Sequence, residues 1–155
     1  MNSSSKLTLN DVLPNGTDTF VISSNSIMQY NTKTDKEFAQ QVQGTGLFTV
    51  KGDPSKNDLT FDFKNKQNNF NGTFETINVS FDLEGVNQQS LVNATLRGSS
   101  DSTINVGTGT QNVKGVHMNG ADFVFGNINP DDAHVTNGIR VADDNIKTEK
   151  LEVSG

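Results

Sequence analysis

The chain has 155 residues, a formal net charge of −6 and no cysteine. The acidic balance argues against nucleic-acid binding, because a protein that grips phosphate backbones needs a basic patch. The lack of cysteine excludes disulfides and thiol chemistry, and it removes the commonest ligands of structural zinc. No run of about 18 apolar residues is present, so we expect no helical membrane span.

The apolar residues gather in short clusters separated by turn-forming residues. Only 32% of the chain is hydrophobic, but it holds ten Phe, most of them beside Leu, Val, Ile or Thr. Gly, Asn, Ser, Thr and Asp lie between the clusters and favour turns. Residues 1–5 contain no apolar stretch and are no signal peptide, so we interpret them as a start added for expression. Residues 6–155 are expected to form a single fragment built of many short strands.

The predicted strands share β-branched or aromatic residues at alternate positions. In chain order they are Lys6–Asn10, Thr19–Ser23, Ser26–Tyr30, Leu47–Lys51, Leu59–Phe63, Gly72–Glu75, Asn78–Leu83, Ala94–Arg97, Thr103–Val106, Asn112–His117, Asp122–Phe125, Ile139–Ala142 and Lys150–Val153. The stretch Asp35–Gln43 is the best candidate helix, because Phe38 and Val42 lie four residues apart. The same residues also alternate as in a polar-faced strand, and strand or irregular structure is favoured.

Two signals compete over how these strands connect. Asn-Gly pairs, which favour tight hairpins, begin at Asn15, Asn71, Asn119 and Asn137, so an antiparallel sandwich stays open. However, Leu59–Phe63 and Val79–Leu83 match in residue type at every position, at an offset of 20 residues. A repeat of roughly 20 residues or more indicates a solenoid, in which each turn of the chain stacks on the previous one.

A solenoid also explains the composition. Each turn contributes a few inward apolar side chains, so a narrow core needs little hydrophobic content. The corners need tight bends, which suits the 14 Gly and the many Asn, since both tolerate left-handed conformations. Only three prolines are present, as expected of strands that pair with neighbours on both sides.

From about Gly44 onward the chain resembles the passenger domains of type V secretion autotransporters, the large adhesins of enterobacteria. The matching motifs occur in a typical order, clearest over residues 46–155, and residues 6–43 show none. They are Gly46–Gly52 (GLFTVKG), Asp58–Phe61 (DLTF), Asn69–Thr73 (NFNGT), Asn93–Leu96 (NATL), Gly107–Val113 (GTGTQNV), Asn119–Phe123 (NGADF) and Thr148–Gly155 (TEKLEVSG).

The resemblance implies a right-handed parallel β-helix, exported through a C-terminal translocator barrel to the bacterial cell surface. It also implies a role in adhesion, aggregation or biofilm formation. The expected partners are a host cell surface, extracellular matrix, glycans or a second copy, with no cofactor.

Candidate catalytic residues are few, and we expect no enzyme. His117 and His134 are the only histidines, and without a Cys, an HExxH or a Ser elbow we expect them at the surface or at corners. Asp62 and Asp82 occupy equivalent places in the 20-residue repeat and could pair as in glycosidases. Both alternate with inward Phe residues, however, so both are expected to face solvent.

Other polar clusters are interpreted as loops. Asn127–Asp132 and Asp143–Asn145 are rich in oxygen atoms, but they lack the spacing of known calcium loops. The sequons at Asn15, Asn71, Asn78 and Asn93 would matter only in a eukaryotic secretory pathway. Two alternatives to an adhesive stalk remain: an autochaperone segment that promotes passenger folding, and a carbohydrate-active β-helix or phage tail-fibre piece.

Overall fold

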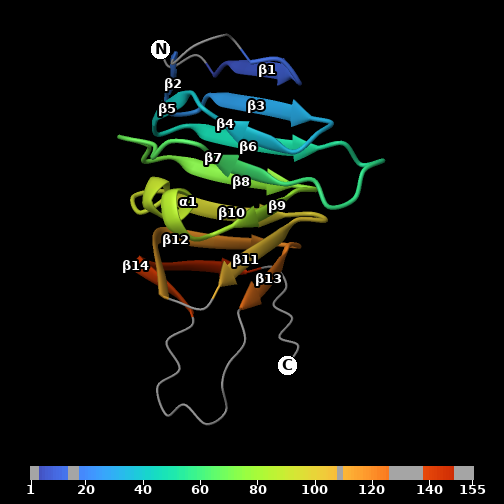
Figure 1. Cartoon of the computed structure of the whole chain (residues 1–155). Helices are drawn as coiled ribbons and strands as arrows, with labels where there is room; N and C mark the ends of the chain where they lie inside the picture. The colour runs from blue at the N-terminus through green and yellow to red at the C-terminus, as the bar shows by residue number, and fades with distance from the viewer. Residues whose placement is uncertain (1–3, 14–17, 108–109, 126–137, 149–155) are drawn as a thin grey trace.

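The chain folds as a stack of short strands joined at corners (Figure 1). The structure, a computed structural model, describes residues 4–13, 18–107, 110–125 and 138–148. The strands are β1 (Lys6–Asn10), β2 (Thr19–Ile22), β3 (Ile27–Thr32), β4 (Lys36–Phe38), β5 (Gln41–Gly44), β6 (Leu47–Gly52), β7 (Phe61–Phe63), β8 (Thr73–Ile77), β9 (Ser80–Asp82), β10 (Thr95–Ser99), β11 (Thr103–Gly107), β12 (Thr110–Asn119), β13 (Asp122–Phe125) and β14 (Gly138–Thr148). One short helix, α1 (Gly85–Ser90), lies between β9 and β10.

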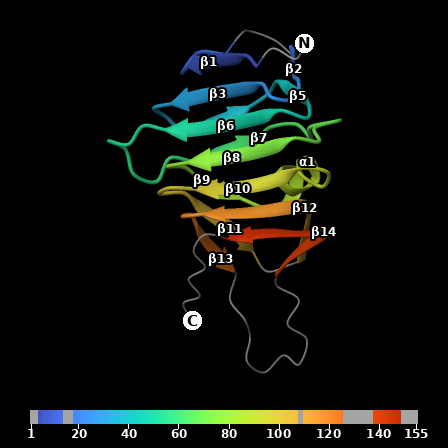
Figure 2. The ribbon, with the colours of Figure 1, turned by 180° about the vertical axis from the view of Figure 1, so that it is seen from behind.

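One sheet runs along the whole stack. Its seven strands follow the order β1-β3-β6-β8-β10-β12-β14, and Figure 2 shows them one beneath another. Three smaller sheets, β13-β11-β9, β2-β5 and β4-β7, form the other sides. The pairings between these strands are all parallel. The predicted parallel β-helix is therefore confirmed, and the antiparallel sandwich is wrong.

Successive strands of the large sheet are separated by one circuit of the chain. Partners in register lie 20 to 26 residues apart along the row Leu7, Met28, Phe48, Phe74, Leu96 and Val116. The predicted 20-residue repeat between Leu59–Phe63 and Val79–Leu83 is confirmed, because Thr60 and Ser80 form a parallel bridge. The Ser80 N–H also donates to the Leu59 carbonyl at 2.7 Å. Within residues 6–43, β1 and β3 join the same ladder, although that stretch carries none of the passenger motifs.

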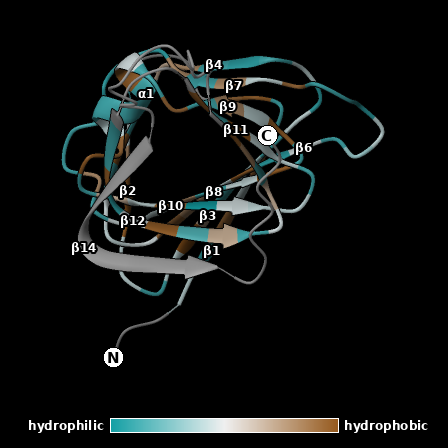
Figure 3. Ribbon diagram, turned by 90° about the horizontal axis from the view of Figure 1, so that it is seen from below, coloured by the Kyte–Doolittle hydropathy of each residue, from teal (hydrophilic) through white to brown (hydrophobic). Residues whose placement is uncertain are grey.

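Phenylalanine rings fill the interior between β4 and β9. The Phe74 ring centroid lies 5.0 Å from that of Phe81 and 5.2 Å from that of Phe63, and all three side chains are buried. Alternation along each strand puts these side chains inside and their polar neighbours outside. Figure 3, viewed along the stack, shows the strands enclosing a single interior.

Left-handed residues make the corner that follows the large sheet. Asp11, Asn78 and Asp101 come just after β1, β8 and β10, with φ between 53° and 57°. Gly120 occupies the same place after β12, with a φ of 90°. Asn, Asp and Gly tolerate this region better than other residues. The Asn and Gly residues predicted for turns therefore occupy corners of the solenoid, and the Asn119-Gly120 pair forms no hairpin.

Three features differ from the sequence prediction or refine it. Asp35–Gln43 holds β4 and the start of β5, so the helical alternative is wrong. The helix α1 was not predicted at all. β12 and β14 are longer than expected, because their pairing with each other continues across a register shift between Val113 and Gly115. The predicted strand Lys150–Val153 lies outside the described residues.

The helix α1 interrupts one side of the stack, and its buried polar side chains replace the missing strand. The Asn87 Oδ1 accepts the Phe63 N–H at 2.8 Å, and the Ser90 Oγ accepts the Gln67 N–H at 2.8 Å. Asn87 and Ser90 are 5% and 2% exposed. A buried N–H without a partner is costly, so these two side chains allow a helix to stack on a β-helix.

Candidate functional site

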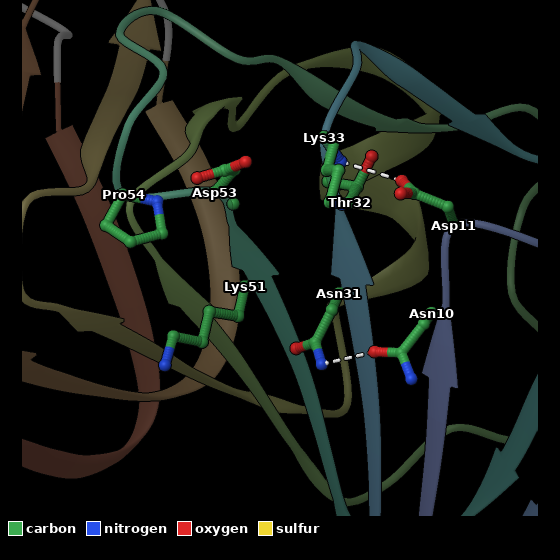
Figure 4. A pocket seen from close by; sticks show the side chains of 9 residues that line it. Asn10, Asp11, Asn31, Thr32, Lys33, Lys51, Asp53 and Pro54 are labelled. Atoms are coloured by element: carbon green, nitrogen blue, oxygen red, sulfur yellow. Dashed lines mark hydrogen bonds between the residues drawn. The ribbon is translucent and has the colours of Figure 1, made fainter.

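A polar groove lies at the ends of β1, β3 and β6, on the outer surface of the large sheet (Figure 4). Its volume is about 390 Å³. The lining residues are Asn10, Asp11, Asn31, Thr32, Lys33, Lys51, Gly52, Asp53 and Pro54. They come from three successive circuits of the solenoid, so stacking alone brings them together.

The floor of the groove is a row of three outward side chains. Asn10, Asn31 and Lys51 occupy the same register position on adjacent strands. The Asn31 Nδ2 donates to the Asn10 Oδ1 at 2.8 Å, and the Asn31 Oδ1 accepts from the Gln29 Nε2 at 2.8 Å. Asn10 and Lys51 are exposed. The row therefore presents amide and ammonium hydrogens to solvent.

The walls of the groove are turns whose carboxylates accept hydrogen bonds, for Asp11 from the next circuit and for Asp53 from within its own turn. The Asp11 Oδ1 accepts the Lys33 N–H at 2.7 Å. The Asp53 Oδ1 accepts the Ser55 N–H at 2.9 Å and the Ser55 hydroxyl at 2.8 Å. These two bonds, the backbone one first, lower the pKa of Asp53, and the nearby Lys33 adds to the effect. Asp53 is therefore ionised at neutral pH and fixed in orientation.

Replacing Ser55 with alanine is expected to raise the pKa of Asp53 toward the ordinary range of an aspartate. The hydroxyl bond is lost and the backbone N–H bond remains, so the return is only partial. Carbon-13 NMR titration of the Asp53 side-chain carboxyl measures the change. Ser100→Ala, at another exposed position, is the control and leaves the titration unchanged. An Asp53 that titrates identically in the Ser55→Ala variant would contradict the turn geometry.

The predicted carboxylate pair lies on another side of the stack. Asp62 on β7 is half-buried and Asp82 on β9 is exposed, while Phe61 and Phe81 beside them are buried as expected. The Asp62 Oδ1 accepts from the Asn87 Nδ2 at 2.9 Å. The Asp82 Oδ1 likewise accepts from the Asn105 Nδ2 at 2.7 Å. Each carboxylate is thus bonded to an amide from the next circuit of the chain.

The remaining candidates do not converge on one site. His117 is half-buried on β12, in register with Arg97 on β10. His134 and Asn127–Asp132 lie outside the described residues. Asp143–Asn145 belongs to β14, where the structure describes the backbone but not the side chains.

The sequon asparagines that the structure describes differ in exposure and in hydrogen bonding. Asn71 and Asn93 are exposed, whereas the Asn78 Nδ2 donates to the Asp53 carbonyl at 2.8 Å. Asn15 lies outside the described residues.

Sequence reasoning missed a charged cluster at the centre of the large sheet. The Glu75 side chain points outward but is only 8% exposed. Its oxygens accept from the Thr49 hydroxyl at 3.0 Å and from the Ser99 hydroxyl at 2.8 Å, and the Arg97 Nε lies 2.9 Å away. Three successive circuits supply these groups, so only the register could have revealed the cluster. Every polar atom of the carboxylate is occupied within the sheet, which indicates a structural role.

Comparisons with known proteins give no assignment. No protein-family model, curated protein or solved structure matches this chain. Within the described ranges, no three His, Asp or Glu side chains gather in a way that could hold a metal ion. In that same part of the chain, no helix has the length and apolar character needed to cross a bilayer.

Proposed function

We propose that the chain is a non-catalytic stalk segment of a secreted bacterial surface protein of the autotransporter passenger type. It serves in adhesion, aggregation or biofilm formation, and its partner is a host cell surface, extracellular matrix or a second copy. The observation that carries the proposal is the seven-stranded parallel ladder along the stack. Each circuit adds about 4.8 Å of length, so such a ladder builds a rod that holds side-chain rows at fixed spacing.

The lateral groove supports the same proposal. A β-helix exposes the outer surface of its sheets along its whole length, and ligands can bind there without a deep pocket. The groove spans three circuits and is lined mostly by polar side chains, of which Asn10, Lys33 and Lys51 are exposed. A stalk with this surface can contact an extended partner laid along the rod.

Surface display tests the proposed function. The chain is placed between the export signal and the translocator barrel of an autotransporter whose own passenger has been removed. Protease shaving measures display, and the same cultures are scored for aggregation and for adhesion to epithelial cells. We expect display together with a several-fold rise in adhesion or aggregation over the barrel alone. Full display with neither effect would overturn the stalk proposal.

The same experiment tests the autochaperone alternative, which the dense packing of Phe rings between β6 and β9 favours. A stable group of circuits is a natural folding nucleus, because a solenoid propagates by stacking on its neighbours. In a second version, a cargo protein is fused to the N-terminal end of the chain. If display of that cargo rises while adhesion and aggregation stay at the control level, the chain promotes folding.

A further inference from the structure

The row of Asn10, Asn31 and Lys51 on the floor of the groove keeps several hydrogen-bond donors open. Among the described residues, the Asn10 Nδ2 and the Lys51 Nζ donate no hydrogen bond, and Asn31 uses one amide hydrogen on Asn10. One oxygen of each flanking carboxylate is engaged, since the Asp11 Oδ1 accepts the Lys33 N–H and the Asp53 Oδ1 accepts from Ser55, while no described residue donates to either Oδ2. Along the row of Asn10, Asn31 and Lys51, the groups left to bind a ligand are therefore mainly amide and ammonium hydrogens.

Position along the row separates the two kinds of donor. Adjacent strands lie about 4.8 Å apart, so the row from Asn10 to Lys51 spans about 10 Å across two strand spacings. Two neutral amides occupy one end and an ammonium group the other. A matching ligand is an extended chain with hydroxyl oxygens at one end and a carboxylate one unit further along.

We propose that this groove binds an acidic oligosaccharide, with a sugar carboxylate on Lys51 and ring hydroxyls on Asn31 and Asn10. The inference rests on the proposed function, for which it names the ligand class. Vicinal hydroxyls pair well with primary amides, since each amide supplies two donors and one acceptor. An ammonium–carboxylate bond is charge-assisted and stronger than a neutral one.

The net charge of the chain does not prevent this binding. At physiological ionic strength the Debye length is about 8 Å, so distant surface carboxylates are largely screened. Near the ligand, Asp53 faces the positive charges of Lys33 and Lys56. Lys51 lies one circuit away from Lys33 and forms no ion pair with another described residue. The ligand carboxylate thus has an ammonium group available to it.

Isothermal titration with tetragalacturonate as the acidic probe and maltotetraose as the neutral probe tests the proposal on the purified chain. We expect tetragalacturonate to bind and Lys51→Gln to weaken binding about tenfold, as for loss of one charge-assisted bond. Asn31→Ala is expected to weaken binding several-fold, and raising the salt concentration weakens it further. The matched control is Lys64→Gln, which removes the same charge from an exposed side chain in the turn that follows β7.

The outcomes separate this inference from the proposed function. Equal binding of both probes, unaffected by Lys51→Gln, would show recognition of hydroxyl groups alone and overturn the acidic ligand. No binding of tetragalacturonate, or equal weakening by Lys51→Gln and Lys64→Gln, would overturn the site. If the displayed chain still mediates adhesion in either case, the stalk function stands without this groove. Unchanged urea midpoints for the three variants show that the fold is retained.

Discussion

Replacing Phe74 with alanine is expected to lower the free energy of unfolding by about 3–5 kcal/mol. The Phe74 ring is fully buried and lies at the centre of the aromatic core. Its centroid lies 5.6 Å from that of Phe48, 5.8 Å from Phe61 and 5.0 Å from Phe81. The substitution removes the ring and leaves a cavity that its neighbours, held on rigid strands, cannot fill.

Solenoid architecture makes this loss more damaging than in a compact domain. Each circuit is stabilised only by the circuits above and below it. Phe74 on β8 packs against Phe48 of the preceding circuit and Phe81 of its own circuit. It also lies in register with Leu96 of the following circuit, so its removal weakens packing both within a circuit and between circuits. Since domains are stable by only about 5–15 kcal/mol, a substantial fraction of the variant is expected to unfold at 37 °C.

Urea denaturation followed by circular dichroism measures the effect. The control is Phe20→Ala on β2, because that side chain is only partly buried at the edge of the core. We expect the control to lose less than half as much stability. Equal losses for the two variants would show that the aromatic stack is not the centre of the core.

The strands could be predicted because each carries its own signal. β1 and β13 have the predicted bounds, since alternating apolar residues meet clear turn residues at both ends. The stacking could be predicted from one repeat, in which Phe61 and Phe81 occupy the same place. The other circuits vary in length because corner loops such as residues 53–58 are inserted between strands, and this variation hides the repeat in the sequence.

The helix and the groove could not be predicted, for two different reasons. α1 buries Asn87 and Ser90 rather than apolar residues, so hydrophobic periodicity has nothing to detect. The groove brings together Asn10, Asn31 and Lys51, which are spaced a full circuit apart in the sequence. Only the register of β1, β3 and β6 shows that they form one row.

Gln67 shows how this chain maintains its stack where no strand is present. The segment that contains Gln67 faces β5 but forms no regular pairing with Val42. Instead, the Gln67 Oε1 accepts the Val42 N–H at 2.6 Å, and its Nε2 donates to the Gln40 carbonyl at 3.0 Å. The side chain is 3% exposed, so one buried amide satisfies two backbone groups that a neighbouring strand would otherwise pair.

Replacing Gln67 with leucine is expected to cost about 1–3 kcal/mol for each of these two buried groups, because water cannot reach them. Gln41→Leu is the matched control. Its Nε2 donates to the Lys66 carbonyl at 3.0 Å, but that bond is exposed, so the loss is expected to stay within about 0.5 kcal/mol. Equal losses in urea denaturation would show that burial does not determine the cost.

Gln67→Glu adds a test by pH. The new carboxyl group would face the Gln40 and Asn65 carbonyl oxygens, which the amide now bonds as a donor. Burial and these oxygens disfavour the charged form, so the pKa of the introduced glutamate is expected to be raised in the folded state. The folded protein then holds a proton that the unfolded chain releases. Stability relative to the native chain therefore falls as the pH rises above about 4.3, the ordinary value for glutamate. A constant difference in unfolding free energy between pH 4 and pH 8 would show that water reaches this position and that Gln67 does not replace a strand.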